Sequence, residues 1–367
     1  MDEKAPQRPL RRGWTTGTCA AAAARAAYEA LVTGRFPDPV PVSLPGGERP
    51  AFALALEERG GGWAKAGIVK DAGDDPDVTH GALVLATVSH GPRGTGVTFR
   101  AGPGVGTVTR PGLPLPPGEP SINPVPRAMI RTALREVAEA TGATGDAIVE
   151  IAIPGGEALA RKTLNPRLGI LGGLSILGTT GIVVPFSCAA WIHSIYRGID
   201  VARAVGLDHV AGATGSTSEA AVQRLHSLPE QALIDMGDFA GGMLKYLRRH
   251  PVPRVTIAGG FAKMTKLGQG LLDLHSRAGE VDLAWLAERL AEADAPAGLV
   301  ARAARANTAL QVLREAAAEG LAVGDIVAGH AWRTAAKVIA GTGMALEITV
   351  FDRDGLLVGR KDFTPAH

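Results

Sequence analysis

The sequence predicts an α+β fold in two domains: an antiparallel-sheet α+β domain over residues 1–190, and a smaller, Rossmann-like α/β domain over residues 191–367. The first reason is length, because 367 residues exceed what one hydrophobic core normally holds. The second is a change of pattern near Ser187, where short strands between turn residues give way to strand–turn–helix units. Apolar residues make up 46% of the chain and aromatic residues only 4%, so both cores should consist mainly of Ala, Val, Leu and Ile.

The net charge argues against a nucleic-acid binder, and the cysteine content argues against a zinc site. Thirty-eight Lys and Arg against 36 Asp and Glu give a formal charge of +2, too balanced for a nucleic-acid binder that works through bulk charge. Cys19 and Cys188 show no CxxC or zinc-ligand spacing, which favours reduced thiols and no metal held by the protein. The first 13 residues carry charge without an apolar stretch, and Gly, Pro or charge interrupts every later apolar run. We therefore expect a cytoplasmic protein without a membrane span.

The first domain should contain two helices and a sheet. Hydroxyl residues able to cap a helix precede an alanine-rich run that ends at a glycine, which predicts a helix over residues 15–34. A second helix is expected over residues 126–140. Short apolar runs between turn residues predict strands over residues 40–44, 51–57, 63–69, 82–89, 96–101, 105–110 and 147–153. The sequence GPG at residues 102–104 suggests a hairpin.

The second domain should begin with an amphipathic helix over residues 190–206. Strand, glycine-containing turn and helix then follow one another three times, within residues 208–225, 232–249 and 255–275. Ser216 or Thr217 is expected to cap the first of these three helices. The remaining expected elements are helices over residues 281–293, 296–319 and 331–340 and strands over residues 345–351 and 356–361.

Polar residues near the start of the chain suggest a ligand site. Thr15, Thr16 and Thr18, with the free amides of a helix start, could hold a carboxylate or phosphate, although they could equally serve only to cap and pack the helix. The segment KDAGDDPDVTHG, residues 70–81, contains four aspartates within seven positions. These carboxylates could bind a metal ion or a cationic ligand group, accept a proton, or simply form a solvated loop.

A glycine-rich stretch at residues 162–187 is the second candidate. Lys162, Asn165 and Arg167 precede it, and Thr179 and Thr180 lie near its end. Its glycines at 172, 173, 178 and 181 suggest backbone amides turned toward a bulky or anionic ligand, which would make the stretch a binding floor. The alternative is a tight crossover in which glycine serves packing alone.

Three glycine turns in the second half, at residues 212–215, 237–242 and 258–260, should lie at the carboxyl ends of parallel strands. Open α/β sheets bind ligands at that edge. None of the turns is a GxGxxG motif, so a dinucleotide fingerprint is absent.

Four long segments resemble the cobalt-precorrin-5B C1-methyltransferase family of anaerobic cobalamin biosynthesis. They are GWTTGTCAAAAA, VKDAGDDPDVTHG, GVGTVTRPGLPLPPGEPSINPVPR and KTLNPRLGILGGLSILGTTGIVVP. GDFAGGML and AGGFAKMTKLGQGLLDLHS in the second half are also similar to family segments, with departures at Ala262 and Leu274. The resemblance implies methyl transfer from S-adenosylmethionine to ring carbon 1 of a cobalt-containing tetrapyrrole, with the cobalt carried by the substrate.

The resemblance assigns roles to the candidate residues. The acidic loop would face the sulfonium or accept a proton, and its residues in that role are Asp71, Asp74, Asp75 and His80. A macrocycle fringed with carboxylates needs cations, amides and hydroxyls around it, which implicates Thr15, Thr16, Thr18, Asn123, Arg127, Lys162, Asn165, Arg167, Ser175, Thr179 and Thr180. The glycine turns would hold the cofactor through Gly212, Thr214, Gly215, Gly237, Asp238, Gly259, Gly260 and Lys263.

Two other classes of function stay open from the sequence. One is a corrinoid carrier that binds the macrocycle without chemistry, and the other is a nucleotide-dependent enzyme that uses the α/β half. Affinity for S-adenosylmethionine or for ATP would separate these classes from a methyltransferase. The only partner expected is the small tetrapyrrole, apart from a possible second copy of the chain.

Overall fold

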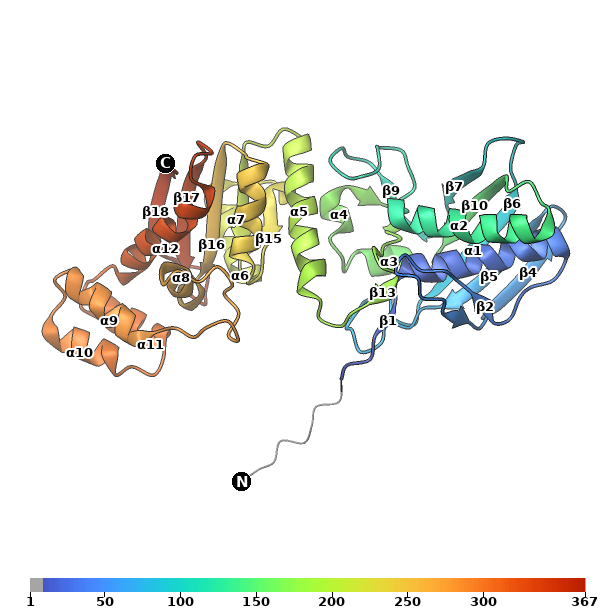
Figure 1. Cartoon of the computed structure of the whole chain (residues 1–367). Coiled ribbons are helices and arrows are strands. Elements are labelled where there is room, and N and C mark those ends of the chain that lie inside the picture. Colours follow the sequence, from blue (N-terminus) through green and yellow to red (C-terminus); the bar gives the residue numbers. More distant parts are fainter. Residues whose placement is uncertain (1–8, 367) are drawn as a thin grey trace, which may run out of the picture. The chain divides into compact units, whose positions relative to one another are not determined.

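The computed structural model describes residues 9–366, so the first eight residues of the charged N-terminal segment lie outside it. The chain forms two compact units, and the division falls between Ser187 and Cys188 (Figure 1). The second unit is nearly as long as the first, so it is not markedly the smaller one. Each unit has its own sheet and helices, and a mixed α+β fold is confirmed.

The first unit is built on a five-stranded sheet with the order β4-β5-β6-β10-β7. Its strands are β4 (Leu56–Gly60), β5 (Trp63–Val69), β6 (Leu83–His90), β7 (Val97–Ala101) and β10 (Ala147–Ala152). All neighbours are antiparallel except β10 and β7, which run parallel. Buried and less buried residues alternate along β6 and β10, because successive side chains of a strand point to opposite faces.

Helix α1 (Thr16–Thr33) packs against β5, β6 and helix α2 (Pro124–Thr141), as Figure 1 shows. Thr15 caps α1 by accepting a hydrogen bond from Thr18 N, and Gly34 ends it with a φ of 79°. Its alanines from Ala20 to Ala24 are fully buried, so their small side chains let the sheet and α2 approach closely. The helix predicted from the alanine run is confirmed.

Short elements complete the first unit. They are β1 (Gly13–Trp14), β2 (Val40–Pro41), β3 (Ala51–Phe52), β8 (Gly104–Val105), β9 (Thr107–Val108), α3 (Gly156–Ala160), α4 (Asn165–Leu168), β11 (Ile170–Leu171), β12 (Gly173–Leu174) and β13 (Ile182–Val183). The hairpin predicted at residues 102–104 is wrong, because β7 pairs with β10 whereas β8 pairs with β12. The predicted strand over residues 105–110 is accordingly split between β8 and β9.

The second unit has a five-stranded sheet with the order β15-β14-β16-β17-β18. Its strands are β14 (His209–Ala213), β15 (Leu233–Asp235), β16 (Arg254–Gly260), β17 (Ala345–Phe351) and β18 (Leu357–Pro365). The first four in this order run parallel, and β18 is antiparallel to β17. Strand β14 is buried along its whole length, as expected for a parallel strand covered on both faces.

Helices surround this second sheet and connect its strands. They are α5 (Cys188–Ala204), α6 (Ser216–His226), η1 (Glu230–Ala232), α7 (Ala240–Arg249), α8 (Phe261–Gly268), α9 (Leu283–Glu292), α10 (Ala297–Ala304), α11 (Ala309–Ala318) and α12 (Val323–Ile339). The expected cap of α6 is wrong: Gly215 occupies the cap position, and Ser218 Oγ donates to Gly215 O over 2.9 Å. Among the described residues, no helix combines the length and apolar character needed to cross a membrane.

Two helix boundaries in the second unit differ from the prediction. The single helix expected over residues 296–319 is two helices, because Thr308 accepts a hydrogen bond from Gln311 N and starts α11. Helix α12 begins at Val323, well before residue 331, and continues through Gly324 and Gly329. A Cβ on Gly324 would lie 1.8 Å from Val358 O, so this glycine permits close packing against β18 and does not break the helix.

Candidate functional site

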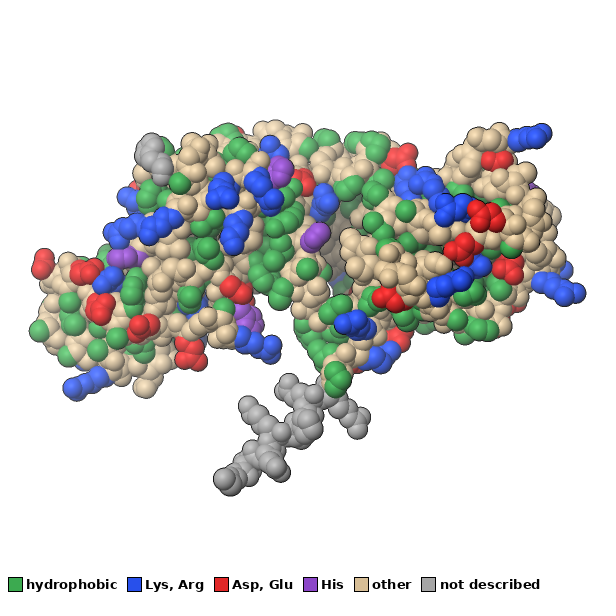
Figure 2. Space-filling view, viewed as in Figure 1, with side chains coloured by type: hydrophobic (Ala, Val, Ile, Leu, Met, Phe, Trp, Pro, Cys, Tyr) green, Lys and Arg blue, Asp and Glu red, His purple; other side chains and the backbone are tan. Residues whose placement is uncertain are grey.

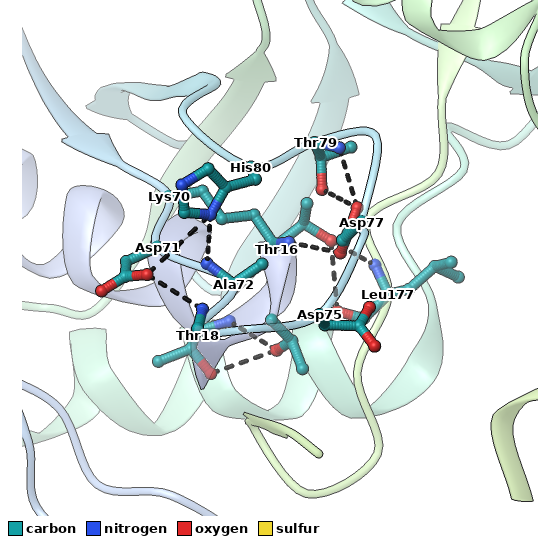
Figure 3. Close-up of polar contacts among 12 residues, drawn as sticks. Thr16, Thr18, Lys70, Asp71, Ala72, Asp75, Asp77, Thr79, His80 and Leu177 are labelled. Atoms are coloured by element: carbon teal, nitrogen blue, oxygen red, sulfur yellow. Dashed lines mark hydrogen bonds and ion pairs between the residues drawn. The ribbon is translucent and has the colours of Figure 1, made fainter. Parts of the chain in front are cut away.

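The first two aspartates of the acidic loop, Asp71 and Asp74, hold the N-terminal segment through Arg11. Figure 3 shows Asp71 in the loop, beside His80. Arg11 binds both carboxylate oxygens of Asp71, with Nη2 donating to Oδ1 over 2.9 Å, and Gly73 N donates to Oδ1 over the same distance. The Arg11 hydrogen bond, followed by the Gly73 amide, lowers the pKa of Asp71 to about 2. Asp74 Oδ2 accepts from Arg11 N over 2.6 Å. Both carboxylates therefore stabilise the fold, so the loop is not simply a solvated loop.

Asp77 neutralises a buried cation. Lys70 is only 1% exposed, and its Nζ donates to Asp77 Oδ2. Thr79 donates to Asp77 Oδ1 through both N and Oγ1, over 2.8 and 2.6 Å. Burial disfavours the ionised form of Asp77, but the bonds from Lys70 and Thr79 outweigh it and lower its pKa. Asp77 is thus a structural carboxylate.

Asp75 and His80 keep polar atoms available. Asp75 Oδ1 accepts from Phe186 N over 2.8 Å, and its Oδ2 has no hydrogen bond to any described residue. His80 Nδ1 accepts from Ala72 N over 3.1 Å, so the same nitrogen cannot donate to Asp71 Oδ1, 3.9 Å away. The His80 ring is 52% exposed, and Nε2 carries the proton of the neutral ring. Of the loop's acidic and histidine side chains, these two are best able to meet a ligand.

The threonines at the start of α1 hold the glycine-rich stretch. Thr16 Oγ1 accepts from Leu177 N over 2.9 Å, and Thr18 Oγ1 donates to Gly181 O over 2.6 Å. Thr15 N donates to Gly181 O as well. Since Thr18 is fully buried, the structure does not present it to a ligand, and the packing interpretation applies to it.

Three of the four glycines in the stretch permit close packing. A Cβ on Gly173 would lie 2.3 Å from the Gly104 backbone, and one on Gly178 would lie 2.3 Å from Thr15 Oγ1. Gly181 would meet Leu44 and Thr18 in the same way. Only Gly172, with a φ of 86°, faces open space. The crossover interpretation therefore accounts for most of these glycines.

Arg127 is enclosed by its own unit. Its Nε donates to Ile122 O over 2.7 Å, and Nη2 donates to Glu119 Oε2 and Pro120 O over 2.8 and 3.0 Å. The guanidinium also lies 5.1 Å from the centre of the Phe99 ring. Asn123 occupies the cap position of α2 without a side-chain capping bond. With three hydrogen bonds made inside its own unit and a side chain only 13% exposed, Arg127 has a structural role.

The polar residues around α4 fall into two groups. Asn165 and Ser175 are buried: Asn165 Nδ2 donates to Gly173 O over 3.0 Å, and Ser175 Oγ donates to Asn165 Oδ1 over 3.2 Å. Lys162 and Thr179 are exposed, and neither side chain bonds a described residue. Arg167 is half-buried, and its carbonyl accepts from Arg110 Nη1.

Exposed apolar side chains accompany the glycine-rich stretch, and sequence reasoning missed them. Leu171, Leu177, Val184 and Phe186 are 54%, 49%, 49% and 67% exposed. Phe186 has a positive φ of 55°, which is strained for a bulky residue, and Asp75 holds its amide. Their signal in the sequence was the apolar composition of residues 162–187, the stretch already interpreted as a binding floor.

In the second unit, the chain reverses direction across the sheet between β14 and β16. From β14 it passes to β15 on one side and then returns to β16 on the other, and open α/β sheets usually bind ligands at such a point, outside the carboxyl ends of the strands, here β14 and β16. Thr214, Asp238 and Lys263 meet there: Lys263 Nζ lies 2.9 Å from Thr214 O and 3.0 Å from Asp238 Oδ1. Asp238 Oδ1 is buried and lacks a well-aligned donor among the described residues.

The predicted cofactor glycines separate into packed and open ones. Gly212 is buried and a Cβ there would lie 2.3 Å from Met243 Sδ, while one on Gly259 would lie 2.6 Å from Met264 Cε. Gly237 would meet the Trp191 ring at 3.2 Å. Gly215 and Gly260, which precede α6 and α8, have nothing within 4 Å of the place that a Cβ would occupy. Only these two leave space beside a helix start.

Basic side chains also gather locally, which the net charge does not reveal. Figure 2 shows Lys and Arg side chains (blue) on the second unit near α7 and α12. The exposed basic residues of these two helices are Lys245, Arg248, Arg249, Arg333 and Lys337.

Comparison with known proteins identifies the family. A family model described as CbiD matches residues 3–185, and one described as CbiD, C-terminal domain, matches residues 273–362. A protein of Bradyrhizobium sp. named cobalt-precorrin-5B C(1)-methyltransferase is 72% identical over 96% of this chain and 94% of its own length. One of the same name from Methylorubrum extorquens is 65% identical over 95% and 97%.

A crystal structure of a cobalamin biosynthesis protein (cbiD) from Archaeoglobus fulgidus is 26% identical, with a TM-score of 0.40 over 78% of this chain and 85% of the other. The resemblance noted in the four long segments is confirmed by the family models and the highly identical relatives. The chain belongs to the CbiD family.

Proposed function

We propose that this protein transfers a methyl group from S-adenosylmethionine to C-1 of cobalt-precorrin-5B, giving cobalt-precorrin-6A in cobalamin biosynthesis. The observation that carries the proposal is 72% identity over 96% of the chain to a protein named for this activity. S-adenosylmethionine supplies an activated methyl group, so positioning of the ring carbon can provide most of the rate acceleration. S-adenosylhomocysteine is the leaving product.

The first unit supports binding of a flat, carboxylate-fringed ring. Leu177 and Phe186 offer exposed apolar surface, and Lys162 and Thr179 offer an ammonium and a hydroxyl for ring carboxylates. In this proposal Asp75, through its available Oδ2, accepts the proton that the ring loses after methylation. Asp71, Asp74 and Asp77 keep the loop in shape and take no part in proton transfer.

The second unit supports binding of the methyl donor. The buried Asp238 Oδ1 can accept a hydrogen bond from an amine or a ribose hydroxyl, and Lys263 lies beside it as a cation for a carboxylate. The space at Gly215 and Gly260 leaves the amides at the starts of α6 and α8 accessible. These residues fit the polar groups of S-adenosylmethionine.

The direct test is an assay with the purified protein, cobalt-precorrin-5B and S-adenosylmethionine that carries a 13C-labelled methyl group. We expect one labelled methyl on the product, located at C-1 by NMR, and one S-adenosylhomocysteine per product. A protein that binds the ring but neither binds S-adenosylmethionine nor forms product would be a carrier, and the proposal would be wrong.

Two variants test the roles of the residues. Asp75→Asn should lower turnover with ring affinity kept, because it removes charge at nearly constant shape, and Asp352→Asn, far along the chain in an exposed turn, serves as the control. Gly215→Val should weaken S-adenosylmethionine binding, measured by calorimetry, because its side chain would occupy the open space. Unchanged cofactor affinity in Gly215→Val would remove the proposed cofactor site from this turn.

A further inference from the structure

A buried polar cluster lies inside the second unit, away from the glycine turns. It consists of His209 on β14, Thr256 on β16, Glu347 on β17 and His226 at the end of α6. Glu347 lies opposite Thr256 in the β16–β17 register, and His209 lies opposite Arg254, two residues before Thr256. Residues two apart share a face of a sheet, so the three strands present these side chains on one face, toward His226.

The polar atoms of the cluster converge on one carboxylate oxygen. Glu347 Oε2 lies 2.7 Å from His226 Nε2 and 2.6 Å from Thr256 Oγ1, and His209 Nε2 lies 2.8 Å from the same hydroxyl. One ligand atom each of His209, His226 and Glu347 lies within 4.8 Å of the other two. Glu347 is fully buried, and His209 is 5% exposed. Phe363 packs against both imidazole rings, with centroids 5.2 and 5.8 Å away.

The charged side chains around the cluster pair with one another. Arg360 donates to Glu347 Oε1 through Nε and Nη2, over 2.8 and 2.6 Å, but its Nε also lies 2.9 Å from Asp362 Oδ1. Arg254 is bound by both carboxylate oxygens of Asp208, over 3.1 and 3.0 Å. Of these three carboxylates only Glu347 is buried, because Asp362 and Asp208 are 82% and 66% exposed. Two neutral imidazoles and one buried carboxylate then match the requirements of a divalent cation.

We propose that His209 Nε2, His226 Nε2 and Glu347 Oε2 bind one divalent transition-metal ion, with zinc preferred, and that the Thr256 hydroxyl or a water completes a tetrahedral shell. Imidazole and carboxylate are ligands that suit zinc. Arg360, bound to the other Glu347 oxygen, fixes the orientation of the carboxylate.

Metal binding requires a modest rearrangement of the cluster. Ligand atoms of a tetrahedral zinc site are about 3.3 Å apart, given Zn–N distances of about 2.0–2.1 Å. His226 Nε2 and Glu347 Oε2, 2.7 Å apart, must separate slightly, whereas the His209 ring, within 4.8 Å of them, must move closer. In the metal-free cluster His226 Nε2 donates to Glu347 Oε2, and His209 Nε2 donates to Thr256 Oγ1, whose own proton goes to the carboxylate. Binding of the ion at these two nitrogens moves both protons to the Nδ1 atoms, so both imidazoles stay neutral.

The position of the cluster indicates a structural role. His209 begins β14, and the proposed cofactor turn follows Ala213, about 13 Å further along the strand. The ion would link the end of α6 to β14 and β17 in addition to the hydrogen bond from His226 to Glu347 and the packing of the His226 ring on His209, with centroids 4.9 Å apart. It should therefore stabilise the second unit without changing S-adenosylmethionine affinity.

The test uses full-length, tag-free protein freed of metal with a chelator and titrated with zinc against a chromophoric competitor. We expect one zinc per chain and a raised thermal midpoint on zinc addition. His226→Gln should bind zinc at least tenfold more weakly, whereas His193→Gln, an exposed histidine outside the cluster, should bind like the original protein. Circular dichroism shows whether each variant is folded.

A second measurement keeps the proposal testable if His226→Gln fails to fold. Cobalt(II) added to the metal-free original protein should give the intense visible bands of a four-coordinate site, and zinc should abolish them. Absence of those bands, or equal zinc affinity in a folded His226→Gln, would mean that the cluster is only a metal-free hydrogen-bond network. Neither result bears on methyl transfer, which is measured separately.

Discussion

Replacing Asp77 by Asn should destabilise the first unit, because it leaves the Lys70 ammonium buried without its counter-charge. Lys70 is 1% exposed, and Asp77 is its ion-pair partner. Asn keeps the shape of Asp and can still accept from Thr79, so the change removes mainly the charge. Breaking a fully buried pair typically costs about 3–5 kcal/mol. Because Asp77 is 26% exposed and water reaches it, we expect about 2–3 kcal/mol.

Calorimetry and urea denaturation measure this loss. For a unit of this length, each kcal/mol moves the thermal midpoint by about 2–4 °C, so Asp77→Asn should lower the midpoint of the first unit by about 4–12 °C. Asp75→Asn is the matched control, since Asp75 accepts one backbone bond from Phe186 and pairs with no buried cation. It should cost about 1 kcal/mol or less.

The pH dependence of the free energy of unfolding tests whether the charge of Asp77 causes the loss of stability. The pKa of Asp77 is lowered by folding, so its contribution is fully present above the unfolded value of about 3.9 and is lost as the pH falls through the folded value. The stability difference between the original protein and Asp77→Asn should therefore be constant from about pH 8 to pH 5 and shrink below about pH 4. A difference under 1 kcal/mol at pH 7, or one that does not shrink in acid, would refute the buried ion pair as the reason for this aspartate.

Two further predictions concern packing. A residue with a side chain at positive φ costs about 1–2 kcal/mol. Gly104→Ala should destabilise the protein by clearly more than this in urea denaturation, because its Cβ would lie 1.9 Å from Ile153 O. Gly118→Ala, also at positive φ but in open space, should show only the smaller cost. Ellman's reagent should label one thiol in the native protein at pH 8 and two after denaturation. The reason is that Cys188 is exposed, whereas Cys19 is buried and burial raises its pKa to about 12. Fast labelling of both thiols in the native protein would contradict the buried position of Cys19 inside α1.

Local patterns in the sequence were sufficient for elements whose determinants are local. The alanine run between Thr15 and Gly34 predicted α1 because capping and helix propensity act within the element itself. The strand over residues 63–69 and the one over residues 345–351 were predicted with the observed bounds, since alternating or continuous apolar residues end there at turn residues. The break between α10 and α11 was missed in the prediction of one helix over residues 296–319, although its signal is local: Thr308 and Gln311 form the pattern of a capping box.

Pairings between distant segments were not readable. The turn at residues 102–104 looked like a hairpin, yet β8 pairs with β12, because Gly104 and Gly173 allow the two backbones to touch. Gly324 is a second example: a Cβ there would lie 1.8 Å from Val358 O, so only the approach of that distant residue explains why a glycine is needed inside α12. In both places the residue satisfies a contact made by a segment far away in the sequence.

The candidate site shows the same difference between what local sequence patterns reveal and what contacts between distant segments decide. The sequence by itself determined the family, through long segments such as those around Asp75 and Lys162, and therefore the class of reaction to propose. Only the tertiary structure decided which residues of those segments have polar atoms to spare, because burial and hydrogen bonding depend on partners brought in from elsewhere. Arg127 is used internally by Glu119, and Asp77 by Lys70, whereas Asp75 keeps an available oxygen. The His209, His226 and Glu347 cluster shows the same rule, since three strands and a helix assemble it from residues up to 138 positions apart along the chain.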